Sequence, residues 1–196
     1  MNREQFDNTF SLFQLSEIIH FHQSTSQVKK LLKTFSCTRN RDLEDFLHNR
    51  TLTFEKHLRS RTYLYIHNET KELAAYFTIA ISMLYTNNIS AKTIKLLDGY
   101  KDDAKTIPCF LIGQLGKSDK YEKFKIGEYI LEDSVDVIDE AHHALGGRFI
   151  LLDAVNDDRL IKFYENNLFF PIELNDENES VKMIRPYFEI LENHYQ

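Results

Sequence analysis

The chain has few of the residues that interrupt or cross-link a protein: six glycines, three prolines and two cysteines among 196 residues, and no tryptophan. Because it has no Gly/Ser-rich or Pro-rich linker, we expect one continuous domain over residues 1–196, with an N-terminal segment at 1–34 and a core at 35–187. The two cysteines, Cys37 and Cys109, lack CxxC spacing and are too few for a disulfide framework. This excludes a disulfide-stabilised secreted fold and fits a reducing compartment.

Long apolar runs and an excess of basic residues are also missing. No apolar run approaches the ~18 residues of a membrane-spanning helix, and the mean hydropathy is −0.42. Residues 1–7 carry no apolar segment, so we expect no secretory signal and a cytoplasmic location. The 24 Lys and Arg are outnumbered by 30 Asp and Glu, for a net charge of −6. This balance argues against a general nucleic-acid or membrane-surface binder, while a local basic face stays compatible with it.

Apolar material for a core is plentiful, with 15 Phe and 10 Tyr. In the first half, residues 10–22 are apolar without a clear period and fit either a strand or a short helix. The other elements expected here are a helix from the Ser24–Ser26 caps to about Leu32, a helix from Asp42 into residues 59–61, and a hairpin of strands 62–67 and 73–84 around a turn at 68–71.

The second half alternates between strand and helix patterns. After a polar loop around Asp98 and Gly99, we expect a strand at 107–116, a helix at 127–145 that ends at Gly146 and Gly147, and a strand at 148–155. A helix from Asp157 or Asp158 to about 167, an acidic turn at 175–179 and a strand at 181–187 follow. This order predicts an α/β (α+β) fold with a mixed sheet flanked by helices.

One candidate binding motif is the charged turn at residues 117–127 between the third strand and the long helix. A strand–turn–helix junction directs backbone N–H groups and the positive end of the helix dipole toward one point, which suits phosphate groups. Lys123 and Lys125 add positive charge there. On its own the pattern also fits a solvated charged loop.

A second motif, at residues 153–169, places Phe163 and Tyr164 in the last turns of a short helix after a strand. A phenol with a pKa near ~10 is protonated at neutral pH and can donate a proton. Two core aromatics are the alternative interpretation of this pair.

Together, and in this order along the chain, the two motifs resemble those of the GNAT superfamily of acetyl-CoA-dependent N-acetyltransferases. Its Q/R-x-x-G-x-G/A loop matches residues 122–127, and its later F-Y-x-x-x-G-F ending matches residues 163–169. Further upstream, Phe35-x-Cys37 and Leu43-x-x-Phe46-Leu47 resemble the opening of one branch, the toxin-like GNAT proteins. The resemblance extends from about Phe35 to Tyr187.

The resemblance implies a GNAT fold, with a central, mostly antiparallel sheet and a splayed strand pair that forms the acetyl-CoA cleft. It implies direct attack of a primary amine on the thioester, with Tyr164 as the general acid toward the departing thiolate. A relayed water and Glu128 are alternatives for the base. The implied cofactor-binding residues are Leu115, Gly116 and Lys117 (pantetheine arm), Glu122, Lys123, Phe124, Lys125, Ile126 and Gly127 (pyrophosphate), and Asn156 and Asp157 (orientation).

Three positions depart from the family pattern. Glu122 stands where Gln or Arg is usual, and Lys125 where the first glycine is usual. Leu168 replaces the glycine of the later motif. Because Lys125 adopts a positive φ less readily than glycine, we expect the loop to follow an altered path.

The acceptor class remains open, with a small-molecule or protein amine as the leading interpretation. Acetylation of aminoacyl-tRNA, as in toxin-type GNAT proteins, is the first alternative, although the net charge of −6 argues against it. A non-catalytic GNAT-fold protein that binds CoA or a partner protein is the second. No membrane partner is expected, and a homodimer is compatible with the sequence.

No metal site is expected. The alternating His20 and His22 would share one face of a strand, but no cluster of carboxylates or cysteines accompanies them nearby. His142 and His143 are expected on the solvent side of the long helix. Cys109 lies in an apolar strand and is interpreted as a buried small side chain.

Overall fold

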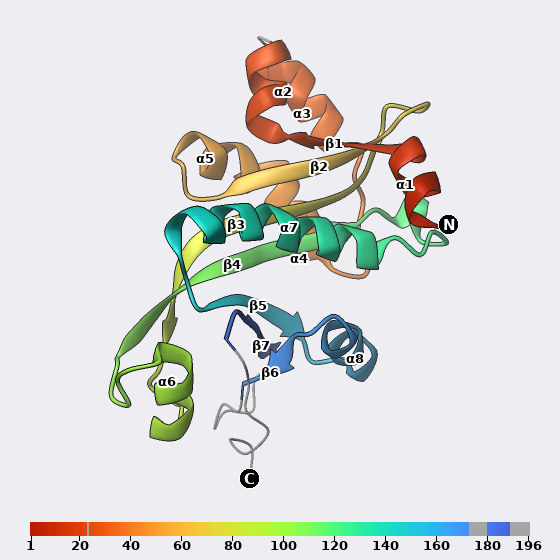
Figure 1. The fold of residues 1–196 in the computed structure, drawn as a ribbon. Coiled ribbons are helices and arrows are strands. Elements are labelled where there is room, and N and C mark those ends of the chain that lie inside the picture. The colour runs from red at the N-terminus through yellow and green to blue at the C-terminus, as the bar shows by residue number, and fades with distance from the viewer. Residues whose placement is uncertain (23, 173–179, 189–196) are drawn as a thin grey trace. The chain divides into compact units, whose positions relative to one another are not determined.

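The computed structural model describes residues 1–22, 24–172 and 180–188 (Figure 1). Its strands are β1 (Phe10–Gln14), β2 (Arg61–His67), β3 (Leu73–Tyr85), β4 (Thr106–Lys117), β5 (Phe149–Val155), β6 (Phe170–Pro171) and β7 (Ser180–Pro186). They form one sheet in the order β1-β2-β3-β4-β5-β7-β6. β4 and β5 are parallel, while β1–β2, β2–β3, β5–β7 and β6–β7 are antiparallel. The predicted mixed, mostly antiparallel sheet is confirmed.

The helices are α1 (Arg3–Thr9), α2 (Leu15–His22), α3 (Thr25–Leu32), α4 (Arg41–Asp45), α5 (Thr51–Lys56), α6 (Ala91–Asp98), α7 (Gly127–Leu145) and α8 (Asp158–Asn166). A π-helical turn, Phe46–Arg50, joins α4 to α5, and a 3₁₀ turn, Asp119–Tyr121, follows β4. Within the described ranges, no helix has both the length and the apolar character required to cross a membrane.

The chain groups into two compact units. The first comprises Met1–Ala80 and Gly113–Ile138, and the second comprises Ile81–Ile112 and Asp139–Gln196. β3, β4 and α7 contribute residues to both units. The expectation of one continuous domain stays a prediction.

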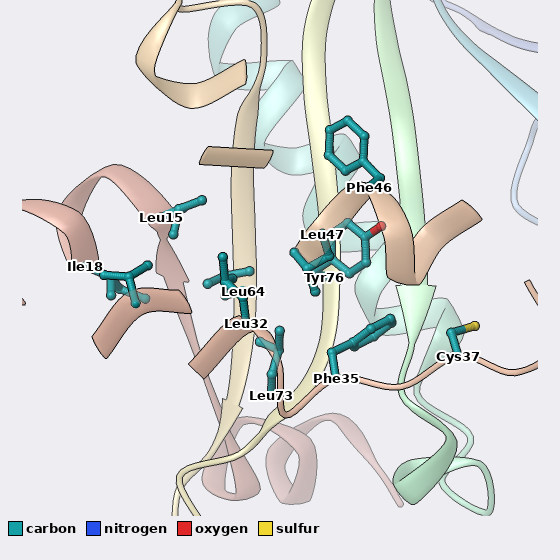
Figure 2. Packing of buried hydrophobic residues seen from close by; sticks show 11 residues of the cluster. Leu15, Ile18, Leu32, Phe35, Cys37, Phe46, Leu47, Leu64, Leu73 and Tyr76 are labelled. Carbon is teal, nitrogen blue, oxygen red and sulfur yellow. The ribbon is translucent and has the colours of Figure 1, made fainter. Parts of the chain in front are cut away.

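In the first unit, the side chains of β2 alternate between two cores. Leu64 packs with Leu32, Phe35 and Tyr76 among residues from α2, α3 and the π-helical turn (Figure 2). The next side chain along the strand, Tyr65, belongs to the other core with residues of α1 and α7. This period of two is what a strand covered on both faces requires.

The N-terminal helix α1 is fastened to α7 by a buried carboxylate. Arg3 Nη1 lies 2.6 Å from Asp133 Oδ1, and the Tyr65 hydroxyl donates to the other oxygen of this carboxylate. Asp133 is buried, so both partners compensate for its lost hydration. α1 was not predicted, because Phe6 is the one apolar residue among its seven and a single apolar position carries no periodicity, although Asn2 and Gln5 form a capping box.

The second unit has its own core, built from β4, β5, α6 and β7. Arg148 closes one end of it by donating to the carbonyls of Leu96 and Leu97 at the end of α6. Gly146 and Gly147 follow α7 with φ of 73° and 142°, as expected for a helix that ends on glycine. Each unit contains one buried cysteine, Cys37 in the first and Cys109 in the second, both 4% exposed.

Most predicted elements are present, with four differences besides the unpredicted α1. Residues 10–22 contain both a strand, β1, and a helix, α2. The helix expected from Asp42 to 59–61 is interrupted by the π-helical turn and ends at Lys56. The loop before Gly99 contains α6, which is capped by Ser90 and Gly99, and β6 was not expected. The acidic turn expected at 175–179 lies outside the described residues.

Candidate functional site

The strand–loop–helix corner at residues 117–127 lies within the first unit. After β4, the Ser118 amide donates to the Ala74 carbonyl, and the 3₁₀ turn then reverses the chain. Tyr121 and Ile126 are buried, and Phe124 packs against the same core. These three side chains anchor the loop to the core of the first unit, while Lys123 and Lys125 are exposed.

Lys117 holds this loop from within. Its Nζ donates to the carbonyls of Glu122 (2.9 Å) and Phe124 (2.6 Å). Burial and the nearby Arg39 guanidinium lower the pKa of the Lys117 ammonium, while Glu122 opposes the shift. A partly dehydrated cation is thus compensated by main-chain oxygens of the loop.

The segment after Phe35 fastens the outer side of the corner. The Asp119 amide donates to the Ser36 carbonyl (2.8 Å), and the Asp119 carboxylate accepts from the Thr38 amide (3.0 Å). Arg39 Nη1 lies 3.2 Å from Glu122 Oε1. The negative charge of Glu122, which would repel a phosphate, is therefore directed toward an arginine.

The start of α7 leaves a row of main-chain donors unused. Within the described part of the chain, the amides of residues 125–129 have no acceptor, and the first helical bond of this region runs from Ile130 to the Ile126 carbonyl. The first N–H groups of a helix have no intrahelical partner and carry the positive end of the dipole. Lys123 and Lys125 form no ion pair with any described residue. This corner is suited to bind an anion.

The end of β4 is tightly packed. A Cβ at Gly116 would lie 3.1 Å from Leu43 and 3.3 Å from Tyr76, so these side chains would have to shift by a few tenths of an ångström to accommodate it. Leu115 packs against the core that contains Tyr65. The predicted role of residues 115–117 is to hold a pantetheine arm. With their side chains engaged in packing or in the loop, the main-chain N–H and C=O groups are the groups that could bind it.

In the second unit, Asp157 caps α8. Its carboxylate accepts from the amides of Arg159 (3.0 Å) and Leu160 (3.1 Å), and these bonds lower its pKa. Asn156 is exposed beside it. Asp157 therefore has a structural role, and the orienting role predicted for both residues stays a prediction.

Tyr164 lies on the buried side of α8 and is 7% exposed. Its ring contacts Phe163 and Phe169, with centroids 5.2 Å and 5.9 Å away. Burial raises the pKa of the phenol to about 12. Its hydroxyl makes no hydrogen bond within the described part of the chain, so the group is a neutral proton donor without a protein acceptor.

Leu168 follows α8 with φ of 66°, and its side chain is 58% exposed. This left-handed conformation is one that glycine adopts without cost. The motif that this segment resembles has glycine at the position of Leu168. The chain therefore has the left-handed conformation that suits glycine, but with a leucine in it.

The structure brings together residues 115–117 and 122–127 in the first unit, and residues 156, 157 and 164 in the second. Sequence reasoning missed Arg39, Asp119 and the Lys117 side chain, whose partners are not visible in any local pattern. His20 and His22 lie on α2 rather than on a strand. No group of three or more potential metal ligands occurs among the described residues.

Comparison with protein-family profiles and with curated protein sequences finds no match for this chain. Solved structures do match. AtaT complexed with acetyl-methionyl-tRNAfMet has a TM-score of 0.67 at 19% identity, covering 90% of this chain and 94% of that one.

Two further structures are similar to the same degree. A tyrosine-to-phenylalanine mutant of KacT has a TM-score of 0.68 at 18% identity, covering 91% of this chain and 95% of that one. AtaTR bound with AcCoA has a TM-score of 0.65 at 18% identity, with 91% and 94% covered. At these identities the likeness is one of fold, and the predicted GNAT fold is confirmed.

Proposed function

We propose that this protein is an N-acetyltransferase that transfers the acetyl group of acetyl-CoA to a primary amine by direct attack. The observation that carries the proposal is the row of amides at residues 125–129, which have no acceptor in the described chain and which begin at the exposed Lys125, two residues after the exposed Lys123. A similar fold in AtaTR bound with AcCoA supports the same ligand.

The residues present fit this cosubstrate. The amides of 125–129 and the start of α7 would bind the pyrophosphate oxygens, since helix N-termini bind phosphates. Lys123 and Lys125 would add positive charge, and Arg39 neutralises Glu122. Acetyl-CoA, when bound, supplies an activated acetyl thioester.

Tyr164 would act on the leaving group. As the acceptor nitrogen forms the new amide bond, it would give up a proton to water, and the carbon–sulfur bond breaks and leaves a thiolate. The Tyr164 hydroxyl would donate its proton to this sulfur and be reprotonated from water. A phenol whose pKa is raised to about 12 stays protonated at neutral pH, as a general acid must.

A thermal-shift titration tests the proposal. A ligand that binds only the native state stabilises it by about 2.7 kcal/mol at a hundredfold excess over Kd. We therefore expect acetyl-CoA and CoA to raise Tm. S-acetylpantetheine, which lacks the pyrophosphate, is the matched control and should raise it much less.

Acetyl-CoA binding is then followed by CoA release with a panel of amines. Release that depends on an acceptor supports the enzyme. An unchanged Tm with saturating acetyl-CoA would remove the proposal. Binding without turnover across amines and charged tRNA would favour the non-catalytic alternative.

Aminoacyl-tRNA is the second candidate acceptor, and it is supported by the similar fold of AtaT complexed with acetyl-methionyl-tRNAfMet. Charge in the first unit argues against it. Five of the basic residues in the first third of the chain face carboxylates, which leaves fewer charges for phosphates: Arg3, Arg39, Arg41, Arg50 and Arg61. We retain the small-molecule or protein amine as the leading class.

Salt dependence separates the two acceptor classes. Binding of a nucleic acid weakens with salt by a slope of about −0.7 to −0.9 per phosphate neutralised. We expect weak salt dependence and nearly full activity after charge reversal of the exposed Lys30 and Lys33. Acetylation of charged tRNA that is abolished by these reversals and by high salt would establish the second candidate instead.

A further inference from the structure

The loop at residues 122–127, the proposed pyrophosphate-binding loop, is held by the Lys117 side chain, whereas the GNAT pattern has glycine in this loop. Among the described residues, Lys125 is not one of the positions with positive φ, so the loop does not use the backbone freedom of the missing glycine. Lys117 instead lies within hydrogen-bond distance of two loop carbonyls, those of Glu122 and Phe124.

These two contacts fix the direction of two amides. A trans peptide group points its C=O and the following N–H in opposite directions. The Glu122 carbonyl shares its peptide group with the Lys123 amide, and the Phe124 carbonyl shares its group with the Lys125 amide. Because both carbonyls face Lys117 Nζ, both amides point away from it, and neither has an acceptor within the described residues.

We propose that Lys117 is a positioning residue that orients the amides of Lys123 and Lys125 for a pyrophosphate group. The inference rests on the proposed acetyl-CoA function. Lys117 acts through the loop, and its charge also favours an anion on the far side of these peptide groups. The Arg39–Glu122 pair, with both side chains exposed, contributes less because water screens it.

Lys117→Met tests this role, since methionine keeps an unbranched apolar stem and removes the three N–H donors. Without Lys117, the carbonyls turn toward water and the amides lose their fixed direction. We expect amide hydrogen exchange in the ligand-free protein to rise about tenfold at Glu122 and Phe124, the two residues of 122–127 whose amides are hydrogen-bonded, and not elsewhere in the first unit. The KM for acetyl-CoA should rise about tenfold, with kcat within about threefold of the unchanged protein.

The matched control is Lys120→Met. Lys120 lies in the same loop, but its Nζ pairs with Glu72 (2.6 Å) and with no loop carbonyl. It should leave exchange at Glu122 and Phe124, and KM, unchanged. Lys117→Arg, which keeps the charge and the donors, should restore most of the affinity, and it also serves if Lys117→Met fails to fold.

The outcomes separate the inference from the proposed function. Unchanged exchange at Glu122 and Phe124 in Lys117→Met would overturn the positioning role, as would a uniform rise across the first unit, which indicates a merely structural lysine. An unchanged protein that does not bind acetyl-CoA, while Lys117→Met still shows faster exchange at these two amides, would overturn the function and leave the loop-holding role supported.

Discussion

Two regions of this protein carry a side chain at a position where the GNAT pattern has glycine, and their backbones differ at that position. In the loop at 122–127, Lys125 replaces the glycine and takes no positive φ. The Lys117 side chain and the Ser36–Arg39 segment hold the loop instead. After α8, Leu168 replaces the glycine but keeps φ at 66°.

The difference follows from what surrounds each position. The loop has polar partners in reach, so its backbone is free to change path. The residues around Leu168 are fixed by main-chain bonds, since the amides of Leu168 and Phe169 donate to the carbonyls of Glu165 and Tyr164. Because this backbone is already hydrogen-bonded, it keeps its left-handed conformation, and Leu168 is strained at a φ that favours glycine.

The largest effect is expected at the chemical step. Tyr164→Phe removes only the hydroxyl, which has no protein partner among the described residues, so stability and acetyl-CoA affinity should change little. Loss of a general acid lowers the rate by about 10²–10⁴-fold. Steady-state kinetics with an identified acceptor measures the change. Tyr100→Phe, at a residue 85% exposed, is the control and should be fully active.

Unchanged turnover in Tyr164→Phe would identify Tyr164 as a core aromatic. That result would also make the Leu168 turn a packing feature alone, with no connection to catalysis.

Leu168→Gly should stabilise the protein. A left-handed φ costs an L-residue roughly 1–2 kcal/mol, and a glycine at this position would avoid that cost. Part of the gain is offset, because glycine loses more backbone entropy on folding. Because Leu168 is 58% exposed, little apolar burial is lost. We expect a gain of about 1 kcal/mol in the free energy of unfolding and a Tm higher by about 2–4 °C. Leu168→Ala is the control and should give no such gain, because alanine keeps the Cβ.

Lys125→Gly should act in the opposite direction. Since Lys125 does not occupy a positive φ, glycine relieves no strain there and only adds conformational freedom to the unfolded chain. We expect a loss of about 0.5–1 kcal/mol, measured by denaturant unfolding. A gain of stability at both positions would show that the two regions respond alike.

The smallest effect concerns alkaline pH. Burial raises the pKa of Tyr164 to about 12, so kcat should show no decline from its ionisation through about pH 10. The folded state favours the protonated phenol, so its contribution to stability is present below the unfolded pKa of about 10 and is lost as pH rises from about 10 to 12. The difference between the pH dependence of Tm in the unchanged protein and that in Tyr164→Phe measures this contribution.

Much of the fold was predictable because long apolar or periodic segments dominate it. The hairpin of β2 and β3 and the strand β4 are apolar runs rich in β-branched and aromatic residues, and the 19-residue helix α7 repeats its apolar residues with the helical period. α1 and α6 were missed because seven or eight residues with mostly polar surfaces give a weak pattern. The π-helical turn has no pattern of its own.

The candidate site was predictable only in part. Its loop and Tyr164 follow from motifs that are local in sequence. The contacts that support the loop join residues far apart in the chain, such as Thr38 to Asp119 and Arg39 to Glu122. The segment after Phe35 reaches the loop because Phe35 packs against Tyr76 of β3 and lies beside Gly116 of β4, and no spacing along the chain predicts these contacts.

The two buried cysteines can report how fast each compact unit opens to solvent. Cys37 reports on the first and Cys109 on the second, and burial raises the pKa of both thiols, that of Cys109 to about 12. Since only a thiolate in contact with solvent reacts quickly with a disulfide reagent, each thiol is trapped when its own unit opens. Two single-cysteine variants would therefore time the opening of the loop-bearing unit and of the Tyr164-bearing unit separately.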